Sequence, residues 1–413
     1  MIEQRQTRRR WLATCAGAAT GMTALSGCNS SDSSDDSSDN GDTTGNGDTS
    51  TRDNSPGRVE DDSDYGAWPM ARYNAANRLS VPHDGLDGEP KILWTAELEG
   101  NVEPPVVYDD TAFVGHDRGT YSAVDLTADG EILWEHDSDG PRVAPAVSDT
   151  AVFVGGDGVE ALTHDDGEVL WTTGHDESVE SLRIYDDTVY AGIGNRVIAL
   201  DEDGNESLEI ETPATVQSLA IDEERIYVRS RPDPDEDEFV MTAYDRDSEE
   251  RLWKHEVTHA QQWFDDRVTK TFPVVDGTVY TVNEDTLISI DGTNGELNEV
   301  VKLEQSSWTR PAIHNNTAYL QRGSMAYDVD TGEIPADWDP EQSADIPFVT
   351  AGGTAYTVAS GLTSPPSLVS MDPITGAGNW SKDALERKNF HYPVVLNDLI
   401  LLPINDPGII AYG

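Results

Sequence analysis

The sequence predicts an all-β fold, an eight-bladed β-propeller of four-stranded antiparallel blades. Two observations predict it: a segment of about 40 residues recurs along the chain, and each copy contains short apolar runs separated by turns. In the clearest copy the runs lie at 104–110, 111–116 and 121–125, and an Asp-Gly turn leads to tryptophan in 129–134. Short strand-like runs at this period are typical of a ring of stacked small sheets.

The ends of the repeats can be placed along the whole chain. They fall at Trp94, Trp134, Trp171, Leu208, Trp253, Val300, Trp338 and Trp380. The intervals run from 37 to 47 residues, which is enough for four short strands. The third run of each repeat usually reads Ala-x-Asp or Ser-x-Asp, but 161–163 has threonine in place of the aspartate.

The phase of the repeat predicts how the ring closes. After Trp380 three apolar runs remain, at 392–397, 399–403 and 408–413, and the sequence ends one strand short of a blade. The run Lys91–Trp94 is left over at the start and supplies the missing strand. Closure by an N-terminal strand removes open sheet edges, so we expect eight blades rather than seven or an open solenoid.

Residues 1–28 are typical of an export signal. Thr-Arg-Arg-Arg-Trp-Leu at 7–12 contains the arginine pair Arg8 and Arg9 of a twin-arginine signal, and an ordinary arginine-rich secretory signal is the alternative. Leu-Ser-Gly-Cys at 25–28 indicates lipid attachment at Cys28. The alternative is a cysteine that stands there by chance and carries no lipid. Residues 29–64 are rich in Ser, Asp and Gly and predict a disordered tether. We therefore expect the propeller, 65–413, to be exported and lipid-anchored on the outer face of the cell membrane.

The charge balance excludes several partners. The chain has 27 Lys and Arg against 78 Asp and Glu, a net charge of −51, which repels nucleic acid and anionic lipid headgroups. This composition resembles that of proteins from salt-loving archaea. At molar salt the screening length falls to about 3 Å, so the repulsion between the many acidic groups is largely screened. A calcium-loaded acidic surface is the alternative. Cys15 leaves with the signal, so no disulfide is expected within the mature chain.

Residues 67–413 resemble the pyrroloquinoline-quinone-like repeat family. The resemblance rests on the Ala-Trp-Pro-Met opening at 67–70 and on Ala-x-Asp followed by Gly-x-x-x-Trp, the tryptophan-docking motif of that family. It implies that the closing tryptophans pack against the next blade. These docking residues are Trp94, Trp134, Trp171, Trp253, Trp338 and Trp380. Leu208 and Val300 depart from the motif, so the third and fifth blades are expected to dock less firmly.

The resemblance implies two functions. Quinone-dependent dehydrogenases of this fold carry a vicinal cysteine pair and a central calcium ion. This sequence has no such pair and lacks their long insertions, so we expect no catalytic residue, cofactor or metal site. A quinone dehydrogenase with calcium stays the alternative. A zinc-protease reading of His-Glu-Val-Thr-His at 255–259 lacks the helical pattern that would bring its histidines together.

The other branch of the family includes the propeller lipoprotein of bacterial outer-membrane assembly. That resemblance implies a non-catalytic, monomeric scaffold that binds a cell-surface protein or peptide through its loops. Candidate channel contacts lie near the starts of innermost strands, at Arg142, Arg183, Arg310 and His391. They would bind an acidic peptide or anion, or else neutralise neighbouring acids. Further candidate contacts are the insertion 230–238, the link 253–272 and the loop 364–366.

Overall fold

A computed structural model describes the propeller region of the chain. The described residues are 63, 65–116, 119–140, 143–175, 177–233, 238–258, 271–303, 311–320, 325–339, 347–359, 366–383, 391–405 and 408–413. The chain divides into two compact units, Met1–Thr51 and Arg52–Gly413, and all described residues belong to the second. The predicted signal at Arg8 and Arg9 and the lipid site at Cys28 therefore lie outside the described part.

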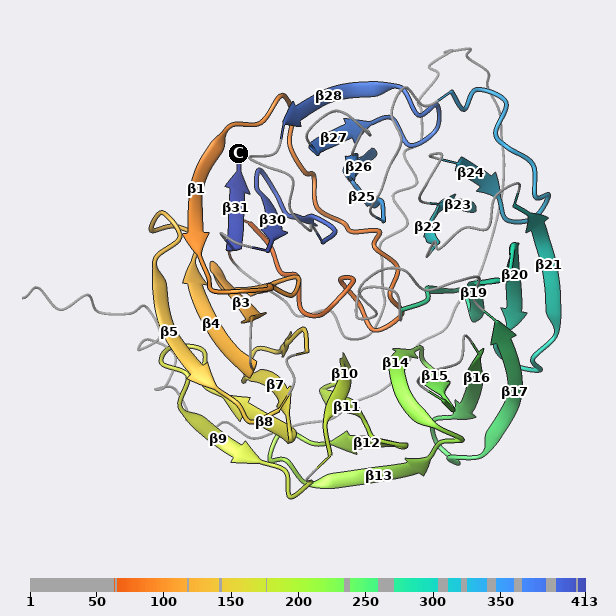
Figure 1. The fold of residues 1–413 in the computed structure, drawn as a ribbon, viewed down its shortest axis with the longest axis horizontal. Coiled ribbons are helices and arrows are strands. Elements are labelled where there is room, and N and C mark those ends of the chain that lie inside the picture. Colours follow the sequence, from red (N-terminus) through yellow and green to blue (C-terminus); the bar gives the residue numbers. More distant parts are fainter. Residues whose placement is uncertain are drawn as a thin grey trace, which may run out of the picture. The chain divides into compact units, whose positions relative to one another are not determined.

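Eight antiparallel sheets surround a common centre, and most of them pair consecutive strands (Figure 1). Blade 1 contains β2 (Val106–Tyr108), β3 (Thr111–His116), β4 (Thr120–Asp125) and β5 (Ile132–Asp137). Blade 2 contains β6 (Ala146–Val147), β7 (Val152–Gly156), β8 (Gly158–Leu162) and β9 (Val169–Thr172). Blade 3 contains β10 (Val179–Tyr185), β11 (Thr188–Ile193), β12 (Arg196–Leu200) and β13 (Glu206–Glu211). Blade 4 contains β14 (Thr215–Ile221), β15 (Arg225–Arg231), β16 (Glu238–Asp245) and β17 (Arg251–Thr258).

The second half of the ring continues in the same order. Blade 5 contains β18 (Val274–Val275), β19 (Thr278–Asn283), β20 (Thr286–Asp291) and β21 (Leu297–Lys302). Blade 6 contains β22 (Ala312–His314), β23 (Thr317–Leu320) and β24 (Met325–Asp328). Blade 7 contains β25 (Val349–Ala351), β26 (Thr354–Ala359), β27 (Ser367–Met371) and β28 (Gly378–Asp383). Blade 8 contains β29 (Val394–Val395), β30 (Ile400–Ile404), β31 (Gly408–Tyr412) and the N-terminal β1 (Ile92–Glu97).

The predicted closure is confirmed. Strand β1 pairs antiparallel with β31, with Trp94 opposite Ala411. The main-chain groups of Lys91 and Gly413 exchange two hydrogen bonds of 2.9 and 3.0 Å. The closing strand extends further than the predicted Lys91–Trp94, to Glu97. The all-β eight-bladed propeller expected from the repeat is therefore the fold of the described residues.

Blade 6 differs from the four-stranded pattern in the described part of the chain. Its sheet has three strands there, and Trp338 lies in a turn closed by a 2.9 Å hydrogen bond from its own N–H to the carbonyl of Pro335. Proline has no N–H to give to a sheet ladder, and here it stands where the other repeats have their fourth strand. Trp338 is nevertheless buried and lies 5.8 Å from the ring of Tyr319, measured between ring centroids.

A tryptophan-on-glycine contact joins neighbouring blades. The indole of Trp134 donates a 2.7 Å hydrogen bond to the carbonyl of His164 in the next blade and covers Gly167. A Cβ at Gly167 would lie 2.7 Å from the ring, and its φ of 69° is one that glycine adopts readily. The same pairing joins Trp94 with Gly130, Trp171 with Gly204, and Trp253 with Gly295. Docking glycine and docking tryptophan are thus two halves of one contact.

A β-bulge directly before the closing residue orients this contact. In blade 1 the register shifts between the pairs Ala123–Trp134 and Val124–Ile132, which leaves Leu133 as the extra residue. Leu133 is consequently 45% exposed while Trp134 is 9% exposed. In blade 5 the shift falls two pairs earlier along the third strand, between Leu287 and Ile288, and Val300 is itself the bulged residue. Val300 therefore occupies a different position from the tryptophans.

Blade 3 departs from the motif together with its neighbour. Leu208 stands opposite Ala199, where the other blades have tryptophan. In blade 4 the turn that should receive it has Glu249, with a φ of 61°, instead of glycine. A side chain is tolerated there because no indole covers the turn. The two substitutions therefore belong to one altered interface.

The repeated aspartate closes a turn. In blade 7 a carboxylate oxygen of Asp372 accepts 2.8 Å hydrogen bonds from the N–H groups of Ile374 and Thr375. These bonds hold the pKa of Asp372 below its usual value. Asp245 and Asp328 make similar turns. The aspartate of the Ala-x-Asp pattern therefore recurs because its carboxylate accepts the main-chain hydrogen bonds of the turn that follows.

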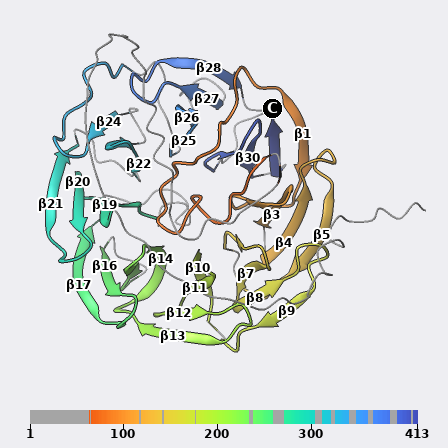
Figure 2. The same cartoon turned by 180° about the vertical axis from the view of Figure 1, so that it is seen from behind.

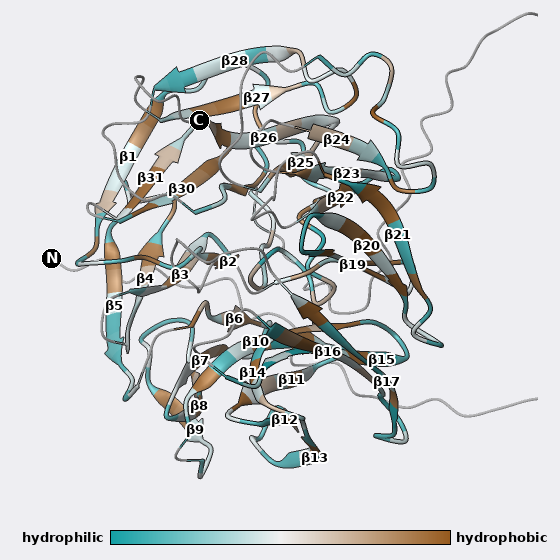
Figure 3. Ribbon diagram, turned by 45° about the vertical axis from the view of Figure 1, so that its right-hand side comes forward, coloured by the Kyte–Doolittle hydropathy of each residue, from teal (hydrophilic) through white to brown (hydrophobic). Residues whose placement is uncertain are grey.

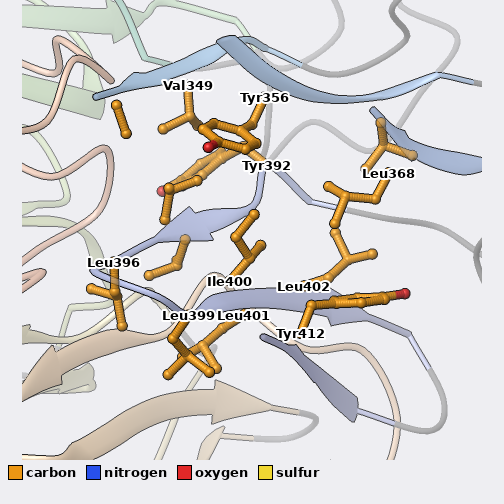
Figure 4. Packing of buried hydrophobic residues seen from close by; sticks show 14 of the residues in the cluster. Val349, Tyr356, Leu368, Tyr392, Leu396, Leu399, Ile400, Leu401, Leu402 and Tyr412 are labelled. Carbon is orange, nitrogen blue, oxygen red and sulfur yellow. The ribbon is translucent and has the colours of Figure 1, made fainter. Parts of the chain in front are cut away.

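The largest apolar cluster combines buried residues of blades 6, 7, 8 and 1 with several from residues 68–81. Figure 4 shows Tyr356, Tyr392, Ile400, Leu402 and Tyr412 gathered between the strands of blades 7 and 8. Figure 3 shows apolar residues concentrated along the strands, whereas the outer strand β13 is mainly hydrophilic. The core is therefore made by packing blade against blade.

Replacing the docking tryptophan tests the blade contact. We expect Trp134→Ala to lower the free energy of unfolding by about 3–5 kcal/mol, because a buried indole and its hydrogen bond are lost. Leu133→Ala, at the exposed bulge next to it, is the matched control and should cost about 1 kcal/mol or less. Denaturant unfolding of both variants measures the difference, and equal losses would contradict the docking role.

The altered interfaces at blades 3 and 5 predict uneven stability. Amide protons of the outer strands β13 and β21 should exchange faster than those of β5 and β17, since Leu208 and Val300 do not provide an indole contact. Hydrogen exchange followed by mass spectrometry measures this. Uniform protection of the four strands would contradict the prediction.

Candidate functional site

Residues 65–90 belong to no blade. They precede β1 and, in Figures 1 and 2, run as the orange trace through the middle of the ring before they reach the outer edge. We call them the central segment. Trp68, Met70, Asn77 and Leu79 are almost completely buried in it. A loop that is buried in this way must find partners for its main-chain polar groups.

The first part of the central segment pairs with blades 1 and 2. Trp68 and Val107 of β2 exchange two main-chain hydrogen bonds, of 2.9 and 2.8 Å. The N–H of Val147 in β6 donates to the carbonyl of Pro69 at 2.7 Å. Proline suits this position because only its carbonyl is needed.

The middle part pairs with blades 4 and 5. The N–H of Ile221, at the end of β14, donates to the carbonyl of Ala75 at 2.9 Å. The N–H of Val274, the first residue of β18, donates to the carbonyl of Ala76 at 2.8 Å. Adjacent residues of the segment thus bond to adjacent blades.

The last part pairs with blades 7 and 8. Thr350 of β25 receives a 2.8 Å hydrogen bond from the N–H of Val81 and donates one of 3.0 Å to the carbonyl of Leu79. In blade 8, the N–H of Asn397 donates to the carbonyl of Tyr65 at 3.0 Å. The N–H of Asp398 donates to the carbonyl of Gly85 at 3.1 Å.

Side chains complete the contacts with blades 3 and 6. Arg183 of β10 donates a 2.6 Å hydrogen bond to the amide oxygen of Asn77. Ser80 lies 2.8 Å from Nδ1 of His314 in β22, measured from its hydroxyl oxygen. The central segment therefore contacts every blade, and each hydrogen bond contributes about 0.5–1.5 kcal/mol.

Asn77 makes three such contacts through its side-chain amide. Its amide nitrogen donates to the carbonyls of Leu219 and Phe272, at 2.9 and 3.0 Å, while its oxygen accepts from Arg183. Its φ is 59°, in the left-handed region that asparagine tolerates better than most residues. Asn77 thus ties blades 3, 4 and 5 together.

Two guanidinium groups are buried at the centre, that of Arg72 in the central segment and that of Arg183 on β10. Arg72 donates from Nη1 to the hydroxyl of Thr271 at 2.6 Å and from Nη2 to the carbonyl of Pro311 at 3.2 Å. Its N–H donates to the hydroxyl of Tyr392 at 2.8 Å. Arg183 also donates from Nη1 to the carbonyl of Leu182 at 2.5 Å.

Burial changes the titration of these groups. It lowers the pKa of Arg72 to about 10 and that of Arg183 to about 10, since a charge is less stable away from water. Burial likewise raises the pKa of Tyr392 to about 12. At neutral pH both arginines are therefore charged and Tyr392 is neutral.

A family model places the chain among known proteins. The model described as outer membrane protein assembly factor BamB matches residues 86–194 and 155–382, which together make up most of the chain. The chain belongs to this family. No curated protein sequence matches it.

Solved structures share the propeller fold of this BamB-family chain. BamB from Moraxella catarrhalis is 15% identical with a TM-score of 0.56, over 79% of this chain and 98% of its own. Quinohemoprotein alcohol dehydrogenase from Comamonas testosteroni is 13% identical with a TM-score of 0.63, over 84% and 80%. The computationally designed protein Ika8 is 13% identical with a TM-score of 0.59, over 81% and 99%. At sequence identities of 13–15%, the similarity to these structures shows a shared fold and nothing further.

The predicted channel contacts have different places. Arg142 and Arg310 lie outside the described residues. Arg183 is the fifth residue of β10 and bonds to the central segment, and His391 lies just before β29; both are buried. Their predicted contact with a ligand stays a prediction.

The repeat pattern does not reveal the central segment. Arg72 and Asn77 belong to no recognisable motif, and Tyr392 lies in the run 392–397, which predicts only a strand. One signal was present: residues 65–90 have no place in the repeat, yet they contain aromatic and apolar side chains that a solvent-exposed linker would lack.

The described residues of this family member do not fit the quinone cofactor that the dehydrogenase resemblance implies. The central segment runs through the described centre of the ring (Figure 1), and its Trp68, Arg72 and Asn77 are almost completely buried. Among the described residues, no group of three His, Cys, Asp or Glu side chains could hold a metal ion such as calcium. We derive no reaction step through the quinone.

The His-Glu-x-x-His pattern forms no helix in its described part. His255 lies on strand β17, partly buried, with Nε2 2.7 Å from the carbonyl of Gly295. Through this contact His255 joins blade 4 to blade 5. His259 lies outside the described residues. No helix in the described part is long and apolar enough to cross a membrane.

Substitution of Asn77 tests the central segment as the part that holds the ring. We expect Asn77→Ala to lower the free energy of unfolding by about 3 kcal/mol or more, because two carbonyls and Arg183 lose their partner. Asn77→Gly keeps the left-handed backbone and is the control. If the glycine variant matches the wild type in denaturant unfolding, backbone conformation alone explains the effect and the bonding role is wrong.

Proposed function

We propose that the protein is a non-catalytic binding scaffold that is exported, anchored by a lipid at Cys28 and held on the outer face of the cell membrane. Its partner is another cell-surface protein or peptide. Membership of the BamB family supports the scaffold, since that family is described as an assembly factor. The signal-like residues 1–28 and the acidic composition support the location and a high-salt environment.

One observation carries the proposal. The central segment bonds to the inner part of every blade, so the described centre is used to hold the fold. Binding then falls to the outer surface and the loops, as is usual on a rigid scaffold. No described feature favours the dehydrogenase as a second candidate.

The outer strands of blades 8, 1 and 2 offer the most apolar exposed surface. Leu93, Leu133 and Leu170 stand at the bulges of β1, β5 and β9 and are 52%, 45% and 53% exposed. These strands follow one another along the rim of the ring in Figure 1, from the upper left (β1) through the left (β5) to the lower left (β9). Exposed apolar groups on neighbouring strands of a strongly acidic protein mark a contact surface for another protein.

A comparison of a triple variant with a double variant tests this surface. The protein is crosslinked in native membranes at high salt and then recovered with its partner. The variant Leu93→Gln, Leu133→Gln, Leu170→Gln should recover at least about tenfold less partner, as expected when several apolar contacts are lost. The control is Ile334→Gln with Ile374→Gln, which are 44% and 69% exposed on other blades.

Three outcomes would count against the proposal. Equal recovery by both variants would remove the contact surface, and no partner in any sample would remove the scaffold. Stoichiometric quinone bound after addition of quinone and calcium would instead establish the dehydrogenase. Full release of a Cys28→Ser variant from membranes is the result expected for the lipid anchor.

A further inference from the structure

Arg72 and Arg183 are the most deeply buried pair of like charges that the described residues contain at the centre. Their side chains are 1% and 2% exposed. Arg183 is hydrogen-bonded to Asn77, five residues beyond Arg72 in the central segment, and its charge adds to the larger effect of burial that lowers the pKa of Arg72. Both also interact with Tyr392, which stays neutral.

Neither guanidinium has an anionic partner within the described ranges. Arg72 and Arg183 donate only to carbonyls, a hydroxyl and an amide oxygen. Surface arginines behave differently: Arg196 bonds to Glu177 and Glu209. A protein with 78 acidic residues thus leaves its two central arginines without a carboxylate in the described part.

Several donors of the same region have no acceptor. The Nε atoms of Arg72 and Arg183 are buried and make no hydrogen bond. The same holds for Nε1 of Trp68 and the amide nitrogen of Asn74, both in the central segment. All four atoms are donors, so what is missing is an acceptor with negative charge or lone pairs.

The physical chemistry of this arrangement is unfavourable without a counter-charge. A guanidinium does not give up its proton in proteins, and an isolated buried charge costs several kcal/mol. Two such charges close together repel each other as well. A negative ion between them removes both costs at once.

We propose that Arg72 and Arg183 bind a small inorganic monoanion of the halide class at the centre of the ring. The nearly complete burial of both side chains favours a small ion over the carboxylate of a peptide. The bound ion joins the central segment, through Arg72, to blade 3, through Arg183. It therefore makes the closure of the ring dependent on halide, independently of the function proposed above.

Bromide is the direct probe. Crystals of the wild-type chain grown or soaked in bromide should show an anomalous peak between the guanidinium groups of Arg72 and Arg183. Bromide found only at surface arginines such as Arg196, or a peak of water at the centre, would overturn the proposal. This measurement requires no variant to fold.

Linkage is the second test. The ratio of folded to unfolded protein should rise up to about tenfold for each tenfold increase in chloride above the dissociation constant, as one bound ion requires. Sodium gluconate replaces sodium chloride to keep the sodium concentration and ionic strength constant. Denaturant unfolding at each chloride concentration gives the slope.

Two variants make the slope specific. Arg183→Gln keeps a donor for Asn77 but removes one charge, so it should lose the chloride dependence beyond that of other salts. Arg196→Gln, at the surface, should retain the wild-type slope. If Arg183→Gln folds and keeps the wild-type slope, or if all three proteins show none, no halide site exists at the centre.

Discussion

The hydrogen bonds between the central segment and the innermost strands are the interaction on which the rest of the propeller depends. Whereas β10 and β14 have seven residues each, the other six innermost strands are short: β6, β18 and β29 have two residues each, and β2, β22 and β25 have three. So short a strand has few ladder bonds of its own within its blade. The main-chain groups of residues 65–90 add partners at the inner ends of the blades. A buried segment with no regular structure is stable here because the eight blades satisfy its polar groups in turn.

The contacts at the periphery follow a different principle. At the outer edge a bulge turns one residue outward and the next inward, and the inward tryptophan rests on the glycine turn of the following blade. Each interface thus needs two positions, one in either blade. Where Leu208 replaces the tryptophan, Glu249 replaces the glycine, as expected if the two positions depend on one contact. The central segment contacts every blade, and the tryptophan-on-glycine contact adds an outer attachment at four of the interfaces between described blades.

The sequence predicts the repeated features of the fold, and it predicts very little about the residues outside the repeat. Eight blades and closure by the strand at Lys91–Trp94 follow from the period, because each repeat is a physically similar unit. The three-stranded described sheet of blade 6 depends on one residue, Pro335, whose effect is local. Arg72, Asn77 and Tyr392 could not be found in this way. Their partners are up to 320 residues distant in the sequence, and contacts at such separation leave no periodic pattern.

The position of the central segment at the start of the propeller has a consequence for folding. Residues 65–90 are synthesised before any strand of the blades, yet their partners extend to Asp398, near the last strand. The segment therefore has no complete binding surface until almost the entire chain has been made. Contacts between distant parts of a chain slow folding, because a large loop must be closed before they form. The ring is consequently completed only long after the central segment has been made. A chain truncated at its C-terminal end loses the strands that hold this segment in place.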